Sequence, residues 1–168
     1  MLETTFRQDL KPVLMQPQAG GIKESYFVIY GDNQNMTVVS PGKNGVEYNK
    51  TFGYFHIYKG AIIYRCLYGQ GLIIMQRNDE FDEAKEFKIV TLHQGRQVEV
   101  PAGYGHCAVN IGKSFLVLID NSPGNIKFQE KEYVKNRRGF VYYIVEKKGE
   151  IGFEHNPNYQ IHPQITTE

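Results

Sequence analysis

Short runs of apolar and β-branched residues, separated by glycine-containing turns, fill most of the chain after residue 24. Such runs, recurring between turns, are typical of an all-β sandwich or barrel. The pattern predicts strands over these ranges: Tyr26–Tyr30, Met36–Ser40, Val46–Ile57 with a kink near Gly53, Ala61–Tyr68, Leu72–Gln76, Phe87–Leu92, Gln97–Val100, Cys107–Ile111 and Phe115–Ile119.

The pattern changes after Pro123-Gly124. A helix is predicted over Gln129–Asn136, followed by strands at Phe140–Glu146 and Ile151–Glu154. A chain of 168 residues suits one domain with a sizeable core. The predicted division is an N-terminal arm at 1–24 with a short strand or helical turn, one domain at 25–160, and an extended tail at 161–168.

The segment from Gly95 to Asn110 combines a turn, a strand, a tight corner and a histidine. Pro101 ends the first strand because it has no N–H to donate, and Gly103 supplies backbone freedom at the corner. His106 follows that corner at the start of a second apolar strand. A histidine at the mouth of a β cup is well placed to hold a metal or a small anion.

The composition argues against several classes of partner. The chain has 19 basic and 18 acidic residues, so its net charge does not favour a nucleic acid or a membrane surface. We expect no signal peptide and no membrane span. The two cysteines are too few for a disulfide framework, and reduced buried thiols in a cytoplasmic protein are the simplest interpretation.

The segment Gly95–Asn110 resembles the second cupin motif position for position at a glycine, a proline, a second glycine, a histidine and an asparagine, which are Gly95, Pro101, Gly103, His106 and Asn110. The resemblance implies a cupin double-stranded β-helix, an antiparallel jelly-roll barrel, here with an N-terminal arm and one short helix. More narrowly, the chain is similar to the archaeal-type glucose-6-phosphate isomerases, which are cupins. The segments that carry this likeness are Ser40–Tyr48, Thr51–His56, Val100–Gly112 and Lys148–Pro157.

The resemblance implies interconversion of glucose 6-phosphate and fructose 6-phosphate with a divalent metal, which would be iron, manganese, nickel or zinc. That family holds its metal with three histidines and a glutamate. Two of these positions are histidines here, His56 and His106, whereas the other two are Tyr54 and Ile62. Two imidazoles alone hold a divalent ion weakly, and isoleucine cannot carry a proton. The predicted metal ligands are His56 and His106, and with Tyr64 they are the predicted catalytic residues.

The resemblance also implies a phosphate-binding set. Carried over to this sequence, its members are Thr37, Thr51 and Gly53, and Tyr54 is added as a further substrate-binding residue. Hydroxyls and backbone N–H groups bind phosphate without a metal. Each threonine also has a simpler interpretation as an ordinary strand residue.

Three functions stay open at this point. The first is a sugar-phosphate isomerase, and the second is a non-catalytic cupin that binds a sugar phosphate or similar metabolite. The third is a dimeric scaffold whose cup is plugged by Tyr54 and Ile62. Several strands are apolar on both faces, so we expect one face to line the cup and the other to pack on a second subunit as a homodimer.

Overall fold

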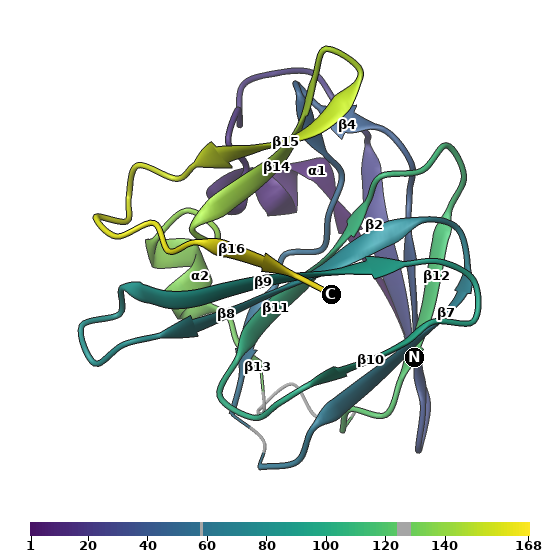
Figure 1. Ribbon diagram of the computed structural model, residues 1–168. Helices are drawn as coiled ribbons and strands as arrows, with labels where there is room; N and C mark the ends of the chain where they lie inside the picture. Colours follow the sequence, from purple (N-terminus) through teal and green to yellow (C-terminus); the bar gives the residue numbers. More distant parts are fainter. Residues whose placement is uncertain (58, 124–128) are drawn as a thin grey trace.

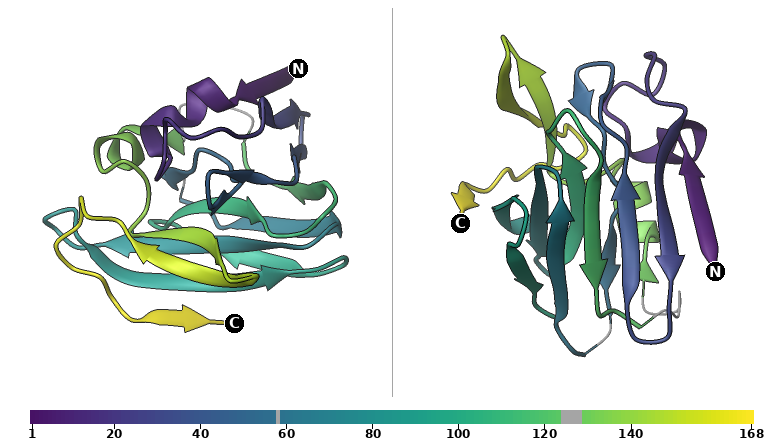
Figure 2. Two further views of the ribbon diagram at one scale, coloured as in Figure 1. Left: turned by 90° about the horizontal axis from the view of Figure 1, so that it is seen from above. Right: turned by 90° about the vertical axis from the view of Figure 1, so that its right-hand side faces the viewer.

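The computed structural model describes residues 1–57, 59–123 and 129–168. Two six-stranded sheets face each other, with strand orders β1-β2-β3-β12-β7-β10 and β13-β6-β11-β8-β9-β16 (Figures 1 and 2). A smaller sheet, β15-β14-β5-β4, lies beside them. Apart from the parallel β9–β16 pair, the strand pairs are antiparallel. The predicted all-β jelly-roll fold is confirmed.

The element bounds follow the chain in order. They are β1 Leu2–Phe6, α1 Arg7–Leu10, the 3₁₀ helix η1 Lys11–Val13, β2 Glu24–Tyr30, β3 Asn35–Val39, β4 Lys43–Asn44, β5 Glu47–Tyr48, β6 Tyr54–His56, β7 Ile62–Tyr68, β8 Gly71–Asn78, β9 Ala84–Leu92, β10 Gln97–Val100, β11 Gly105–Asn110, β12 Leu116–Asp120, β13 Gln129–Glu130, α2 Glu132–Asn136, β14 Tyr142–Lys147, β15 Glu150–His155 and β16 Ile165–Thr167.

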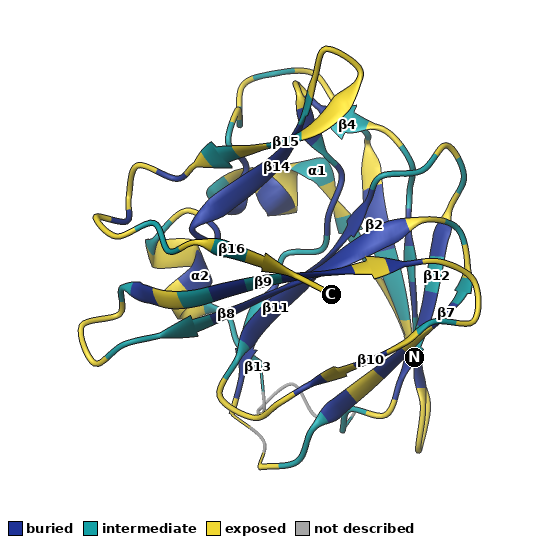
Figure 3. Ribbon diagram, viewed as in Figure 1, coloured by how far each residue is buried: buried dark blue, intermediate teal, exposed yellow. Residues whose placement is uncertain are grey.

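Side-chain alternation decides which groups enter the space between the two large sheets. Along β7, Ile62, Tyr64 and Cys66 are buried, whereas Ile63 and Arg65 between them are exposed. Strand β11 is buried at every position because it lies in the middle of its sheet (Figure 3). The core therefore fills the interior of the barrel, and polar side chains on the same inward faces must share it.

The predicted long strand over Val46–Ile57 is wrong. The chain forms β5 and β6, with an irregular stretch between them. Gly53 has a φ of +83°, a conformation that interrupts a strand, and a Cβ at this position would meet the Phe140 ring at 2.6 Å. The backbone N–H of Thr51 instead donates to the carbonyl of Ala108, which ties the irregular stretch to β11.

The helix predicted over Gln129–Asn136 is shorter than expected. Gln129 and Glu130 form β13, which pairs with β6 opposite His56 and Phe55, and α2 begins only at Glu132. Backbone pairing with β6 overrides the helical preference of the sequence at this point. The residues between the end of β12 and this strand include 124–128, which lie outside the described residues.

The corner between β10 and β11 has the predicted form. Gly103 has a φ of +86°, and the N–H of Tyr104 donates to the carbonyl of Pro101 across the turn. His106 is the second residue of β11 and is 2% exposed. The corner therefore places the His106 imidazole in the interior of the barrel.

The two ends of the chain both add strands to the large sheets. Strand β1 pairs with β2 on one side of the molecule, and β16 pairs with β9 on the other (Figure 2). Within the segment 161–168, residues Ile165–Thr167 form the strand β16. Among the described residues, no helix has the length and apolar character needed to span a membrane.

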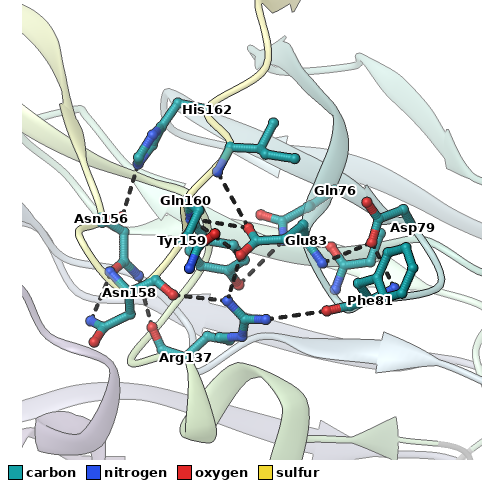
Figure 4. Close-up of polar contacts among 12 residues, drawn as sticks. Gln76, Asp79, Phe81, Glu83, Arg137, Asn156, Asn158, Tyr159, Gln160 and His162 are labelled. Atoms are coloured by element: carbon teal, nitrogen blue, oxygen red, sulfur yellow. Dashed lines mark hydrogen bonds and ion pairs between the residues drawn. The ribbon is translucent and has the colours of Figure 1, made fainter.

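A network of polar contacts holds the chain between β15 and β16. We call it the C-terminal cluster and define it as Gln76, Glu83, Arg137, Asn156 and Tyr159 (Figure 4). Glu83 accepts from the backbone N–H groups of Gln160 and Ile161 and pairs with Arg137 at 3.2 Å. Asn156 donates to the carbonyls of Arg137 and Phe140, each at 2.9 Å. The cluster joins the β8–β9 hairpin to the C-terminal segment.

Candidate functional site

A cavity opens between the two large sheets, and we call it the cup. Its walls carry inward-facing side chains of β2, β3, β6, β7, β11 and β12. The cavity measures about 60 Å³, which is room for several ordered waters. A six-carbon phosphosugar is larger than that, so it would also extend through the mouth, where Glu3 and Lys131 lie.

At the inner end of the cup, Tyr54 and Tyr64 lie against His106, whereas His56 lies near the same imidazole but lines a different pocket. The Tyr64 hydroxyl lies 2.8 Å from Nε2 of His106. The Tyr54 ring packs edge-on against His106 with a centroid distance of 4.6 Å, and the His56 ring is 6.5 Å from the same imidazole. Residues from β6, β7 and β11 therefore converge on His106.

Burial makes this end of the cup electrically neutral. Burial, with a smaller contribution from the charge of His56, lowers the pKa of His106 to about 3. Burial also raises the pKa of the Tyr54 and Tyr64 hydroxyls above their ordinary value. At neutral pH the imidazole is uncharged and both phenols keep their protons. These groups are suited to hydrogen bonding and poorly suited to removing a proton from carbon.

A divalent metal does not fit this arrangement of side chains. The described residues contain no group of three or more histidine, cysteine, aspartate or glutamate side chains placed to hold an ion. The remaining residues, 58 and 124–128, include none of these four types in the sequence. One ring nitrogen of His106 is already bonded to Tyr64, and Ile62 stands where a carboxylate is expected from the resemblance. Two imidazoles therefore lack the further ligands that a bound ion needs.

The predicted phosphate-binding residues lie in the same cup as the histidine on β11. Thr37, Thr51, Gly53, Tyr54, Tyr64 and His106 all line the one cavity. Thr37 is 8% exposed, and the Thr51 hydroxyl oxygen accepts from the backbone N–H of Ala108 at 3.0 Å. Gly53 is explained by its backbone angle and close packing alone, whereas Thr37 is a buried polar residue that lines the cavity.

The sequence analysis missed a polar group on the opposite wall. Asp120 ends β12, lines the cup and lies beside Asn35 of β3 and Tyr64 of β7 in the strand register. Its carboxylate is 7% exposed, and burial raises its pKa. A signal was present, because Asp120 directly follows the predicted strand Phe115–Ile119 and continues the same face as Leu116 and Leu118.

These features define the class of the protein. Two facing antiparallel sheets, a glycine-proline-glycine-histidine corner and a polar cavity that receives the histidine are those of a cupin. The sequence profile of the family described as Glucose-6-phosphate isomerase (GPI) matches residues 22–162, most of the chain. The chain belongs to this family.

Individual relatives are distant. Glucose-6-phosphate isomerase of Pyrococcus furiosus is 28% identical over 129 residues, and that of Thermococcus onnurineus is 30% identical over 132 residues. Each match covers 76% of this chain and 65% of the relative, so the chain spans about two thirds of their length. The CENP-C cupin domain of Drosophila melanogaster is 12% identical, covering 66% of this chain and 79% of that one with a TM-score of 0.43, and a likeness this low carries no information about function.

Proposed function

We propose that the cup binds a phosphorylated sugar, with the phosphate at Thr37, Thr51 and Gly53. The observation that carries this proposal is that those three residues line the same cavity as Tyr54, Tyr64 and His106. Uncharged phenols and a neutral imidazole accept and donate hydrogen bonds to sugar hydroxyls. Family membership supports a sugar phosphate as the ligand, since the relatives are named glucose-6-phosphate isomerases.

Calorimetric titration with glucose 6-phosphate and fructose 6-phosphate tests the proposal. Thr37→Val removes one hydroxyl with little change of shape, and we expect it to weaken binding about fivefold to tenfold, as one lost charge-assisted hydrogen bond does. Thr91→Val, at an exposed position of β9, is the matched control. The proposal fails if the wild-type protein releases no heat with either sugar phosphate, or if both variants bind like the wild type.

Isomerisation of the bound sugar phosphate is a second candidate. It is favoured by the contact between the predicted catalytic residues Tyr64 and His106 in the cup, with the His56 ring 6.5 Å from that of His106. The exchange moves a proton between C1 and C2, and it needs a base near its working pH. His106, with its pKa lowered to about 3, is a weak base for that step, so binding ranks ahead of catalysis. A coupled assay of fructose 6-phosphate turnover distinguishes the two candidates.

We also propose that the chain forms a homodimer through the outer face of the β1-β2-β3-β12-β7 region. Side chains on this face pair across strands as Leu2 with Ile29, Ile29 with Met36, and Met36 with Ile119. Ile29 is 44% exposed and Leu2 is 62% exposed. An exposed apolar face marks an interaction surface, and a twofold dimer would bury the same face of both subunits.

Sedimentation tests the dimer. A lysine in place of Val38, in the middle of this face, should convert the protein to monomers, whereas Thr91→Lys on the other sheet should not. A wild-type protein that sediments as a monomer at micromolar concentration contradicts the dimer.

A further inference from the structure

Asp120 is the buried carboxylate of the cup, and no part of the proposed function uses it so far. It lies at the end of β12, opposite Asn35 in the pairing of β12 with β3 and opposite Tyr64 in the pairing with β7. The same cavity that Tyr54 and His106 line reaches its side chain. A charged group in this position is expensive to bury unless hydrogen-bond donors surround it.

The described residues supply donors to one of the two carboxylate oxygens, Oδ1. Oδ1 accepts from the Asn35 side chain at 3.2 Å, from the backbone N–H of Ser122 at 2.8 Å and from the Ser122 hydroxyl. Within residues 1–57, 59–123 and 129–168, no donor lies within hydrogen-bond distance of Oδ2. The carboxylate is therefore fixed in place by one oxygen, and the other remains available to a ligand.

The carboxylate also makes the two ends of the cup chemically different. Thr37 lies two residues along β3 from Asn35, so the threonine and the Asn35–Asp120 pair are separated by about 7 Å along the strand. A phosphate dianion is repelled by a carboxylate at close range, particularly where solvent is excluded. The hydroxyl-bearing end of a ligand is instead attracted, because a carboxylate accepts hydrogen bonds and donates none.

We propose that Asp120 is a specificity-determining residue, and that its Oδ2 accepts a hydrogen bond from a hydroxyl group of the sugar while the phosphate lies at the Thr37 end of the cup. This inference rests on the proposed function. It assigns the cup a preference for phosphorylated polyhydroxyl compounds over inorganic phosphate. The negative charge of Asp120 also orients the ligand, because it repels the phosphate end and attracts the hydroxyl-bearing end.

Asp120→Asn provides the test, because asparagine keeps an Oδ1 that accepts from Asn35 and Ser122 and replaces Oδ2 with a donor. We expect fructose 6-phosphate to bind about tenfold more weakly to this variant, with the affinity for inorganic phosphate unchanged or slightly higher, since a negative charge has been removed. Asp32→Asn, in an exposed turn, is the matched control and should bind both ligands like the wild type. Both ligands are titrated by calorimetry, and each variant is melted.

The outcomes separate the two proposals. If the wild-type protein binds neither fructose 6-phosphate nor inorganic phosphate, the proposed function fails and the role of Asp120 fails with it. If the wild type binds fructose 6-phosphate and Asp120→Asn binds it equally well, the proposed function is supported and the role of Asp120 is overturned. An equal loss of both ligands together with early melting shows that Asp120 holds the fold, which also overturns the inference.

Discussion

The cup and the C-terminal cluster are both buried polar regions, yet they differ in how completely their hydrogen bonds are formed. In the cluster, Asn156 uses its amide nitrogen and its oxygen, and both oxygens of Glu83 accept from the chain. In the cup, Nδ1 of His106 is buried with no hydrogen-bond partner among the described residues, and Oδ2 of Asp120 receives no donor from them.

This difference is the one expected if the cluster serves the fold and the cup serves the ligand that we propose. A fully satisfied network exchanges bonds to water for bonds within the chain, so it can be kept for the fold alone. A group left without a partner costs free energy in the empty protein, and a ligand can recover that cost on binding. The three predictions below test this distinction, beginning with the largest expected effect.

Asn156→Ala should have the largest effect, because the part-buried carbonyl of Arg137 and the buried carbonyl of Phe140 lose the donor that the Asn156 side chain supplies. We expect the free energy of unfolding to fall by about 4 kcal/mol, as expected when two carbonyls lose their partners. Urea denaturation measures it. Asn136→Ala, at an exposed position of α2, is the control and should change stability little. Equal stability of the two variants would remove the contrast between the cluster and the cup.

Acid should destabilise the protein through the cup. The pKa of His106 is about 3 in the folded protein and about 6.5 in the unfolded chain. At pH values between these two, the unfolded chain therefore binds a proton that the folded protein does not bind. Stability therefore falls as pH drops below about 6.5, by about 3 kcal/mol at about pH 4, and the loss ends below about pH 3. The lowered pKa of His56 acts in the same direction.

His106→Gln keeps an acceptor for the Tyr64 hydroxyl but does not titrate, so its stability should change less over this range. Urea denaturation at a series of pH values gives the slopes. His93→Gln, at an exposed loop residue, serves as the control and should keep the slope of the wild type. Parallel curves for the wild type and His106→Gln would show that this imidazole does not control the response to acid.

Adding a divalent metal should have the smallest effect on the stability of the protein. Because the described residues hold no group of three metal-binding side chains around His56 and His106, we expect excess Co²⁺ to raise the melting temperature of the wild type by less than about 1 °C and to give no ligand-field absorption band. Tyr54→His alone, and combined with Ile62→Glu, should gain such a band. One tightly bound Co²⁺ per wild-type chain would contradict the lack of fit.

Sequence patterns predicted most of the fold because strands and turns depend on local chemistry. The corner at Pro101–Gly103 follows from a residue without an N–H and a residue without a side chain, and it has the predicted form. The errors occurred where distant backbone decided the outcome. Gln129 and Glu130 pair with β6, and the stretch between β5 and β6 is tied to β11, which no local pattern reveals.

Some of the residues that line the cup were predicted and others were not, for a similar reason. The family resemblance identified Thr37, Thr51, Tyr54, Tyr64 and His106, and the structure brings them to one cavity. Asp120 and Asn35 were missed because neither belongs to a quoted motif, and they become neighbours only when β3 pairs with β12. Their partnership joins residues 85 positions apart in the chain.

By itself, the sequence determined the family, the all-β class and the position of each histidine, because these depend on residue types at short spacing. Only the tertiary structure decided that the Tyr64 hydroxyl is hydrogen-bonded to a ring nitrogen of His106 and that Asp120 lines the same cavity. Burial and strand pairing set both facts, and each arises from contacts between segments that are remote in sequence.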